Sequence, residues 1–308
     1  MAGMSGTPAQ AGRRGDMPDT LPHSRPRKPI GWPWRDRAGR FSALRLSLLI
    51  GLLAPGAVLL FLLEAGAMGA EPWKAAMREA GAHALHILLL SLAVTPLRHV
   101  ADWPKVATLR RMVGIAALGY ALLHLTLYTG HLAWDLLAVA GEIATRIYLT
   151  LGFAVLLGLA VMGWTSTDGW QKRLGARWKR IHRWVYLLAA AGVLHAFLQS
   201  KSGADAAVLM AGFWLWLMGW RLLPGRWRAH GVALAVLAAL AALGAAAVEF
   251  AWYATATRLP APRILAANLG FEAGVRPAQW VLLAGLALAL LPWLRRVTRR
   301  PAPARAAV

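Results

Sequence analysis

Long apolar segments recur along this chain, and they constrain its fold more than any other feature. A helix needs about 20 apolar residues to cross a hydrocarbon core of about 30 Å. Hydrophobic residues make up 58% of the 308 residues. Runs close to the required length occupy residues 43–63, 82–97, 112–128, 147–164, 183–199, 206–220, 232–253 and 278–294. We therefore expect an all-α, polytopic transmembrane helical bundle of about eight spans.

The positive charge is distributed unevenly among the loops. The net charge is +21, which in a soluble protein would suggest nucleic acid binding. Here the basic residues fall in alternate loops, and 27 of the 34 Lys and Arg residues lie on the side of the N-terminus. Because Lys and Arg in short loops set the orientation of membrane spans, both the N- and C-termini are predicted to be cytoplasmic. Membrane lipid, with no nucleic acid, is the expected partner of this charge.

Two histidines, His124 and His195, lie at the same depth in two different runs. Each is ~12 residues into its run, and a rise of about 1.5 Å per residue places both ~18 Å from one membrane face. An ionisable residue inside a bilayer helix is costly and by default marks a functional site. Facing imidazoles at one depth are what a haem iron needs as axial ligands. The alternative is that each histidine only forms a hydrogen bond to a neighbouring helix.

The chain contains no cysteine. This excludes disulfides, cysteine-ligated iron–sulfur clusters and thiolate-bound haem, so metal chemistry has to use imidazole. Small residues on the same side of the two helices as the histidines would leave room for a flat macrocycle. They are Gly114, Ala117, Ala121, Ala191 and Gly192. The same residues would also allow helices to pack closely in lipid, so this pattern leaves both interpretations open.

The segment between the fourth and fifth runs is both basic and amphipathic. Its apolar residues recur at helical spacing, which predicts one interfacial helix that continues into the fifth run. They are Trp170, Leu174, Trp178, Ile181 and Val185. The basic residues of this face can bind lipid headgroups, or they can bind anionic cofactor groups, because guanidinium groups pair with carboxylate and phosphate. The candidates for the second role are Arg110, Arg111, Arg173 and Arg180.

Four further histidines are less easily placed. His182 lies thirteen residues before the second histidine of the pair, about 20 Å along a helix and about 140° around it. It is a candidate ligand of a second haem, a contact of another cofactor, or an interfacial anchor. His99 is its one obvious partner at similar depth. His83 and His86 lie near the outer end of the second run, where we expect them to be exposed.

Several motifs occur together in an order and spacing that resemble a known family. They are LSLAVTPLR at 90–98, LRRMVG at 109–114, YALLHL at 120–125, TST at 165–167, QKRLG at 171–175 with Trp178, and His182 followed by VYL at 185–187 and His195. The chain resembles the MsrQ (YedZ) family over roughly residues 44–220. Members of this family are haem-binding membrane subunits of the periplasmic methionine sulfoxide reductase system, within the ferric reductase-like transmembrane group.

The resemblance implies a multi-pass b-type haem protein of the bacterial inner membrane that is also associated with FMN. It implies a non-catalytic electron-transfer subunit that passes electrons from the quinone pool, as quinol, to a periplasmic molybdopterin-containing partner. That partner repairs oxidised proteins by reducing methionine sulfoxide. By motif match, His124, His182 and His195 occupy the haem-iron positions of the family. The wider group usually has a second histidine thirteen or fourteen residues before the first of these, where this chain has Arg111 and Arg110.

The composition, the apolar runs and the resemblance together divide the chain into three parts. Residues 1–40 are expected to be a disordered basic cytoplasmic tail, residues 41–225 a six-span haem-binding core, and residues 226–308 two additional spans with a basic C-terminal tail. No Gly-rich dinucleotide fingerprint is present, so electrons are expected from quinol or from a separate protein. A ferric reductase-like or other transmembrane haem b reductase is the nearest alternative. A solute permease and a passive membrane anchor are alternatives of other classes.

Overall fold

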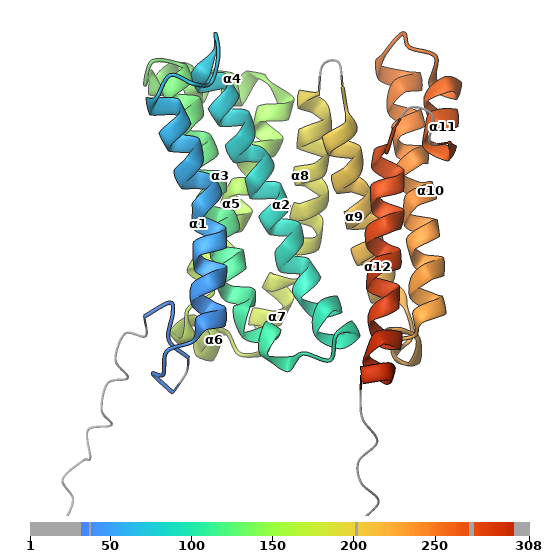
Figure 1. The fold of residues 1–308 in the computed structure, drawn as a ribbon. Helices are drawn as coiled ribbons and strands as arrows, with labels where there is room; N and C mark the ends of the chain where they lie inside the picture. The colour runs from blue at the N-terminus through green and yellow to red at the C-terminus, as the bar shows by residue number, and fades with distance from the viewer. Residues whose placement is uncertain (1–31, 37, 201–202, 271–273, 299–308) are drawn as a thin grey trace, which may run out of the picture.

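The computed structural model describes residues 32–36, 38–200, 203–270 and 274–298, and these form a bundle of helices (Figure 1). Eight long helices run along the bundle: α1 (Ala43–Glu64), α2 (Pro72–Val100), α3 (Arg110–His131), α5 (Ile147–Trp164), α8 (Val185–Gln199), α9 (Asp205–Leu222), α10 (Gly231–Ala256) and α12 (Pro277–Thr298). The short helices are η1 (Pro104–Leu109), α4 (Leu136–Thr145), α6 (Asp168–Leu174), α7 (Ala176–His182), η2 (Gly225–Trp227) and α11 (Ala261–Leu269). The only β pairing among the described residues is an isolated bridge between Arg35 and Phe41.

The polytopic helical bundle predicted from the apolar runs is confirmed. Seven of the described helical segments are long and apolar enough to cross a membrane. Eight spans were expected, and the one that is not apolar enough to be counted is α9. This helix nevertheless packs against α8, α10 and α12 within the bundle. Asp205 and Arg221 lie at its two ends and three tryptophans lie between them, which lowers its mean hydropathy.

Two boundaries differ from the sequence prediction. Helix α2 begins at Pro72, about ten residues before the second apolar run, because proline is well suited to the first turn of a helix. His83 and His86 therefore lie well inside this helix rather than near its end, and His83 is half-buried. The sequence analysis also did not predict α4, whose first turn is capped by the carboxylate of Asp135.

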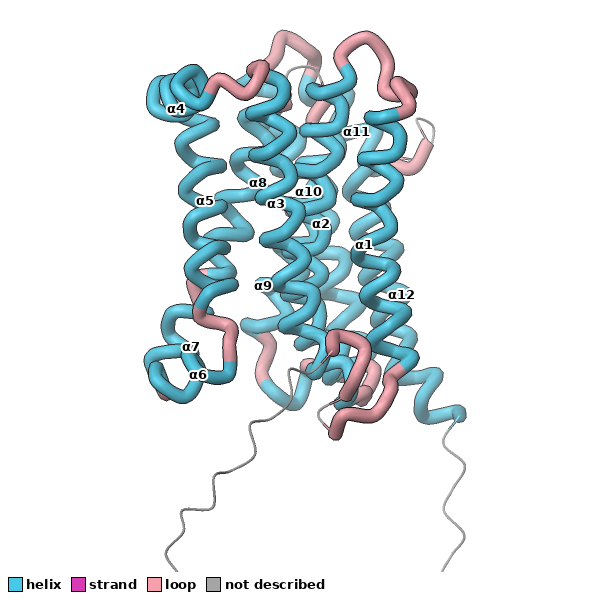
Figure 2. Tube along the Cα trace, turned by 90° about the vertical axis from the view of Figure 1, so that its left-hand side faces the viewer, coloured by secondary structure: helices cyan, strands magenta, loops and turns pink. Residues whose placement is uncertain are grey.

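The prediction of one continuous amphipathic helix between the fourth and fifth runs is wrong, because the segment forms two helices. Gly175, with a φ of +49°, separates α6 from α7. A positive φ is disfavoured for residues that carry a Cβ, so this glycine allows the turn that a continuous helix cannot make. The basic segment therefore consists of two short helices, and Figure 2 shows both at one end of the bundle with α4 at the other end.

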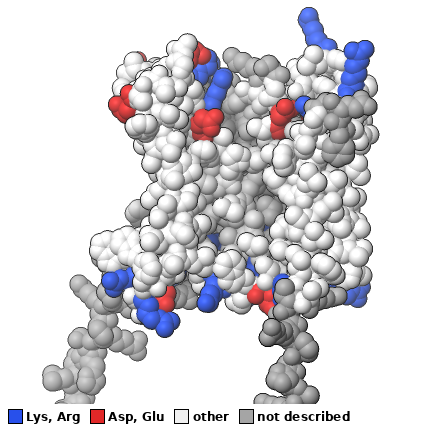
Figure 3. All heavy atoms as spheres, in the orientation of Figure 1, with Lys and Arg blue, Asp and Glu red and all other residues white. Residues whose placement is uncertain are grey.

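Helix α1 begins and helix α12 ends at the same end of the bundle (Figure 1). On the face shown in Figure 3, charged side chains gather toward the two ends and leave an uncharged belt between them. This arrangement suits a membrane protein whose termini share one side. That this side is cytoplasmic remains a prediction from the Lys and Arg distribution. Residues 1–31 and 299–308, which carry most of the two predicted basic tails, lie outside the described residues.

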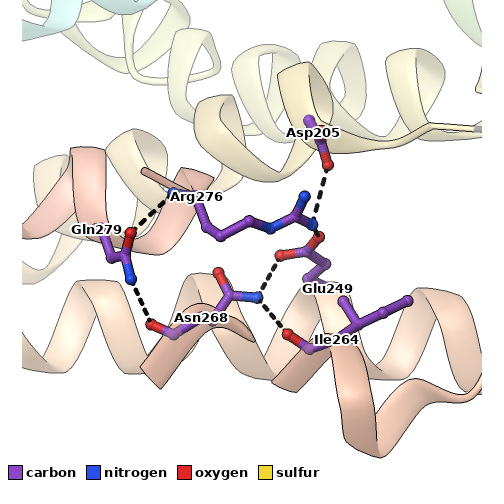
Figure 4. Close-up of polar contacts among 6 residues, drawn as sticks. All are labelled: Asp205, Glu249, Ile264, Asn268, Arg276 and Gln279. Carbon is purple, nitrogen blue, oxygen red and sulfur yellow. Dashed lines mark hydrogen bonds and ion pairs between the residues drawn. The ribbon is translucent and has the colours of Figure 1, made fainter. Parts of the chain in front are cut away.

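A buried polar cluster joins the C-terminal helices to α9 (Figure 4). The carboxylate of Glu249, which is fully buried in α10, pairs with the guanidinium of Arg276 and accepts a 2.7 Å hydrogen bond from Nδ2 of Asn268. Arg276 also reaches Asp205 at the start of α9, at 3.3 Å. Asp205, Glu249 and Asn268 lie on α9, α10 and α11, and Arg276 directly precedes α12, so the cluster holds these four helices together at one end of the bundle.

Candidate functional site

The fold brings His124 of α3 and His195 of α8 together inside the bundle. The centroids of the two rings are 6.4 Å apart, and the ring planes are nearly perpendicular, at 84°. Both residues are half-buried. Two histidines that are 71 positions apart in the sequence therefore form one pair, as expected from their equal depth.

A backbone carbonyl orients each ring. Nδ1 of His124 is 2.7 Å from the carbonyl oxygen of Met77 in α2, and Nδ1 of His195 is 2.8 Å from the carbonyl oxygen of Tyr148 in α5. A carbonyl can only accept, so Nδ1 of each ring carries the proton and donates. This fixes the tautomer and leaves Nε2 as the nitrogen available to a metal.

A glycine makes room for each ring. A Cβ at Gly81 would lie 2.8 Å from Nδ1 of His124, and a Cβ at Gly152 would lie 2.6 Å from Cε1 of His195. Both distances are shorter than normal contacts, so a side chain at either position would displace the imidazole. The histidine rings thus lie directly against the backbones of α2 and α5.

The two halves of this site repeat the same spacing. Each orienting carbonyl lies 47 residues before its histidine, and each glycine lies four residues after that carbonyl. The sequence analysis missed these four helper positions, which are Met77, Gly81, Tyr148 and Gly152. The equal separation of Gly81 from His124 and of Gly152 from His195 was the available signal.

The donor set fits a haem iron. A porphyrin supplies four nitrogens, so the protein needs to add only two axial ligands, and a pair of neutral imidazoles is suitable. An iron bonded at about 2 Å to one nitrogen of each ring would hold the two centroids roughly 6 Å apart, close to the observed 6.4 Å. The separation of the two rings is thus the one that an iron with two axial imidazoles requires.

The small residues near the histidines do not all leave open space. An added Cβ at Gly114 would meet no atom within 4 Å, so this position has open space beside it. Ala117 is fully buried in the core, and a Cβ at Gly192 would be in ordinary contact with Leu85, at 3.4 Å. For these two positions the close-packing interpretation is the one that the structure supports.

The structure places His182 away from this pair, at the end of the bundle where α7 lies. Its Nε2 is 3.1 Å from Oγ1 of Thr165, and its ring stacks on Trp178 at a centroid distance of 4.1 Å. The suggested partner His99 contacts the carbonyl of Thr95 at 2.8 Å and the ring of Trp220 instead. In the part of the chain that the structure describes, His99 and His182 therefore contact other residues and do not form a pair.

The four candidate arginines lie at the same end but do not converge on one point. Arg110 donates to the hydroxyl of Thr95, and Arg111 pairs with Asp168 at 2.9 Å. The guanidinium of Arg173 lies 5.7 Å from the ring centroid of Trp170, and Arg180 is exposed.

Comparison with known proteins places the chain among haem-binding membrane subunits. Residues 80–193 match the family described as ferric reductase like transmembrane component. The chain is similar to the protein-methionine-sulfoxide reductase heme-binding subunit MsrQ of Caulobacter vibrioides, with 38% identity over 62% of this chain and 94% of that protein. The subunit of the same name from Rhodospirillum rubrum is 40% identical over 62% of this chain and 90% of its own length. No solved structure matches the chain.

Proposed function

Because the chain belongs to the MsrQ family of heme-binding subunits of protein-methionine-sulfoxide reductase, we propose that it binds haem b between His124 and His195 and serves as a membrane electron-transfer subunit. The observation that carries this proposal is the pair of imidazoles 6.4 Å apart, each with Nδ1 already bonded to a backbone carbonyl. A haem held there supplies one-electron chemistry at its iron.

The chain contributes the holding and tuning of that group. The carbonyls of Met77 and Tyr148 keep the two rings in one orientation and make Nε2 more basic, as outer partners of ligating histidines do. Buried apolar side chains of α2, α3, α5 and α8 form part of the core of the bundle in which the pair lies. Neither histidine has a carboxylate partner among the described residues, so a role in holding a metal fits the pair better than proton transfer does.

We further propose the electron donor and acceptor that the family resemblance implies. The donor is quinol in the bacterial inner membrane, and the acceptor is a periplasmic molybdopterin-containing reductase. Oxidation of one quinol releases two electrons and two protons, and reduction of one methionine sulfoxide consumes two of each and yields methionine and water. The stoichiometry therefore balances with the chain as a non-catalytic carrier.

The resemblance also implies FMN, and the basic end of the bundle is the region that suits its phosphate. Arg110 and Arg111 have partners within the chain. All four arginines are exposed, but among the described residues Arg173 and Arg180 form no ion pair or side-chain hydrogen bond, so they are the more accessible pair for an anionic group. We propose these two positions as the first to examine for flavin binding.

An optical spectrum with haem and flavin quantified per chain tests the proposal. We expect the purified full chain to contain about one haem b, with the paired absorption bands of a bis-histidine centre, and to become reduced by a quinol under anaerobic conditions. The same preparation in which both His124 and His195 are alanine is the control and should lack the haem bands. A colourless wild-type chain that transports a solute in liposomes would contradict the proposal in favour of a permease.

A further inference from the structure

The turn between α3 and α4 holds an exposed tryptophan at the end of the bundle opposite the one where α1 begins (Figure 1). Trp134 is 57% exposed, and its backbone N–H donates to the carbonyl of Thr129 at 2.8 Å. Ala133 and Trp134 have φ angles of +52° and +64°, whereas helix ends usually place a glycine in this conformation. Residues with a Cβ seldom adopt such angles, and they do so mainly at functional sites. The conformation of this turn therefore points to a role beyond connecting two helices.

A second tryptophan connects Trp134 to the region of the histidine pair. The ring of Trp73, at the start of α2, meets the ring of Trp134 edge-on, with centroids 6.2 Å apart and an angle of 85° between the planes. The Trp73 ring also lies directly against the backbone of Gly130 in α3, where an added Cβ would overlap it. Met77, whose carbonyl orients His124, is one turn further along α2. Two tryptophans and one turn of α2 therefore link this surface to the histidine pair.

The segments around this turn carry a net negative charge, although the net charge of the whole chain is +21. Residues 64–79 and 128–146 contain five acidic and three basic side chains, and Figure 3 shows acidic groups at this end of the bundle. Asp135 directly follows the tryptophan and is exposed, and its contacts among the described residues are the backbone N–H groups that it caps in α4. The acidic residues are Glu64, Glu71, Glu79, Asp135 and Glu142, and the basic ones are Lys74, Arg78 and Arg146.

The surface beside this carboxylate is apolar. Leu136 and Leu137, the first two residues of α4, are both highly exposed. Together with Trp134 and Asp135 they form what we call the α3–α4 surface. An exposed aromatic and aliphatic centre with charged groups around it is the usual composition of a surface that binds another protein.

The sign of the charge distinguishes this surface from one that binds lipid headgroups. At the opposite end of the bundle, α6 and α7 together carry five Lys and Arg residues and one Asp, as interfacial helices that hold anionic headgroups do. The segments around Trp134 have the reverse balance. An anionic membrane surface repels their carboxylates, whereas a protein with basic side chains complements them.

We propose that the α3–α4 surface binds a soluble partner protein, with the ring of Trp134 in an apolar recess of the partner and basic side chains of the partner facing Asp135 and its acidic neighbours. That this partner is the methionine sulfoxide reductase rests on the proposed function, whereas its basic and apolar character rests on the surface alone. Binding at this position places an electron acceptor beside the two tryptophans that lead toward His124, at the end of the bundle predicted to be periplasmic.

A binding measurement on the full, haem-loaded chain in nanodiscs tests this inference, with the purified periplasmic methionine sulfoxide reductase of the same organism as the probe. Surface plasmon resonance should show a Kd that rises with salt, because exposed charges are screened. Trp134→Asn removes the ring but keeps a residue that tolerates the left-handed conformation, and it should raise the Kd about tenfold. Trp164→Asn is the matched control, because Trp164 is 70% exposed at the opposite end of the bundle, and it should bind as the wild type does.

A second variant isolates the charge of this surface. Asp135→Asn keeps the Oδ1 atom that caps α4 and removes the carboxylate charge. It should raise the Kd about threefold and lessen the dependence of the Kd on salt. Haem per chain should equal the wild-type value in every variant, which separates a loss of binding from a loss of structure.

Photo-crosslinking from the same position gives an independent result. With Trp134→p-benzoyl-L-phenylalanine, we expect a crosslink to the reductase. A Kd that neither Trp134→Asn nor Asp135→Asn changes, or a crosslink that forms only to lipid, overturns the proposal and indicates that the α3–α4 surface lies in the membrane surface. Failure of the proposed function is distinguishable, because saturating reductase would then not reoxidise the reduced haem of the wild-type chain.

Discussion

The two helical regions that carry His124 and His195 also carry a second pair of positions, and the two pairs differ in what their side chains contact. His124 and His195 form the pair inside the bundle, and thirteen residues before each of them lie Arg111 and His182. At the inner pair, Nδ1 of both rings is bonded and Nε2 is left available. At the other pair, Arg111 is bonded to Asp168, and Nε2 of His182 is in contact with Thr165. Equal spacing along a helix therefore does not make two equal sites.

The largest effect on haem binding is expected when one of the two proposed ligands, His124 or His195, is removed. His124→Ala and His195→Ala should each lose nearly all haem absorbance, because one remaining imidazole leaves the iron without its second axial bond. Haem per chain, measured by optical spectroscopy on purified protein, gives the answer. Full retention of the wild-type spectrum in either variant would refute the assignment.

The next largest effect on haem binding is expected when the glycine that makes room for each imidazole is replaced. Gly81→Ala and Gly152→Ala should each lower haem affinity by roughly tenfold, because a methyl group would push the imidazole off its carbonyl partner. Haem titration into the apoprotein measures this change. The matched control is Gly119→Ala on α3, where an added Cβ meets no atom within 4 Å. Since alanine favours helix over glycine by about 1 kcal/mol, lost helix stability cannot explain the expected result.

A smaller effect is expected at the other pair. His182→Ala should leave haem content at the wild-type value and lower the free energy of unfolding by about 1 kcal/mol, because the ring loses its contacts with Thr165 and Trp178. The measurements are haem per chain and a denaturation curve. A halving of haem content in His182→Ala would show that His182 also binds a haem iron, and the two pairs would then not differ in function.

The smallest effect is expected for the ion pair between Arg111 and Asp168, because Arg111 is the counterpart of His182 in the second pair of positions. Asp168→Asn should change stability by less than about 1 kcal/mol and leave the spectrum unchanged, since the two side chains are 47% and 83% exposed. A thermal denaturation series at two salt concentrations measures it. A shift of the haem bands in this variant would mean that the end of α3 communicates with the inner pair.

Much of the fold was predictable because membrane helices are long and apolar. The bundle, the basic loops and the depth of His124 and His195 followed from run length and rise per residue. The start of α2 did not, because its first turns contain Lys74 and Arg78 and therefore interrupt the apolar pattern. The break at Gly175 was also missed, because helical spacing continues across it in the sequence.

The two histidines of the candidate site were predictable from the sequence, whereas the backbone groups that orient their rings were not. Side-chain type and depth identify a histidine pair, whereas the carbonyl groups of Met77 and Tyr148 carry no sequence signature. The exposure of Trp134 was likewise not predictable, since the chain has 16 tryptophans and only the structure shows which of them face outward.

The buried pair of Glu249 and Arg276 has a consequence for biogenesis. Arg276 follows Glu249 by 27 residues, so a ribosome delivers the acidic residue to the translocon well before its counter-ion. Glu249 lies about two turns before the end of α10, and a charge inside a membrane helix is costly unless it is paired. We therefore expect α10 to settle fully into lipid only after the residues that lead into α12 have been synthesised and can supply Arg276.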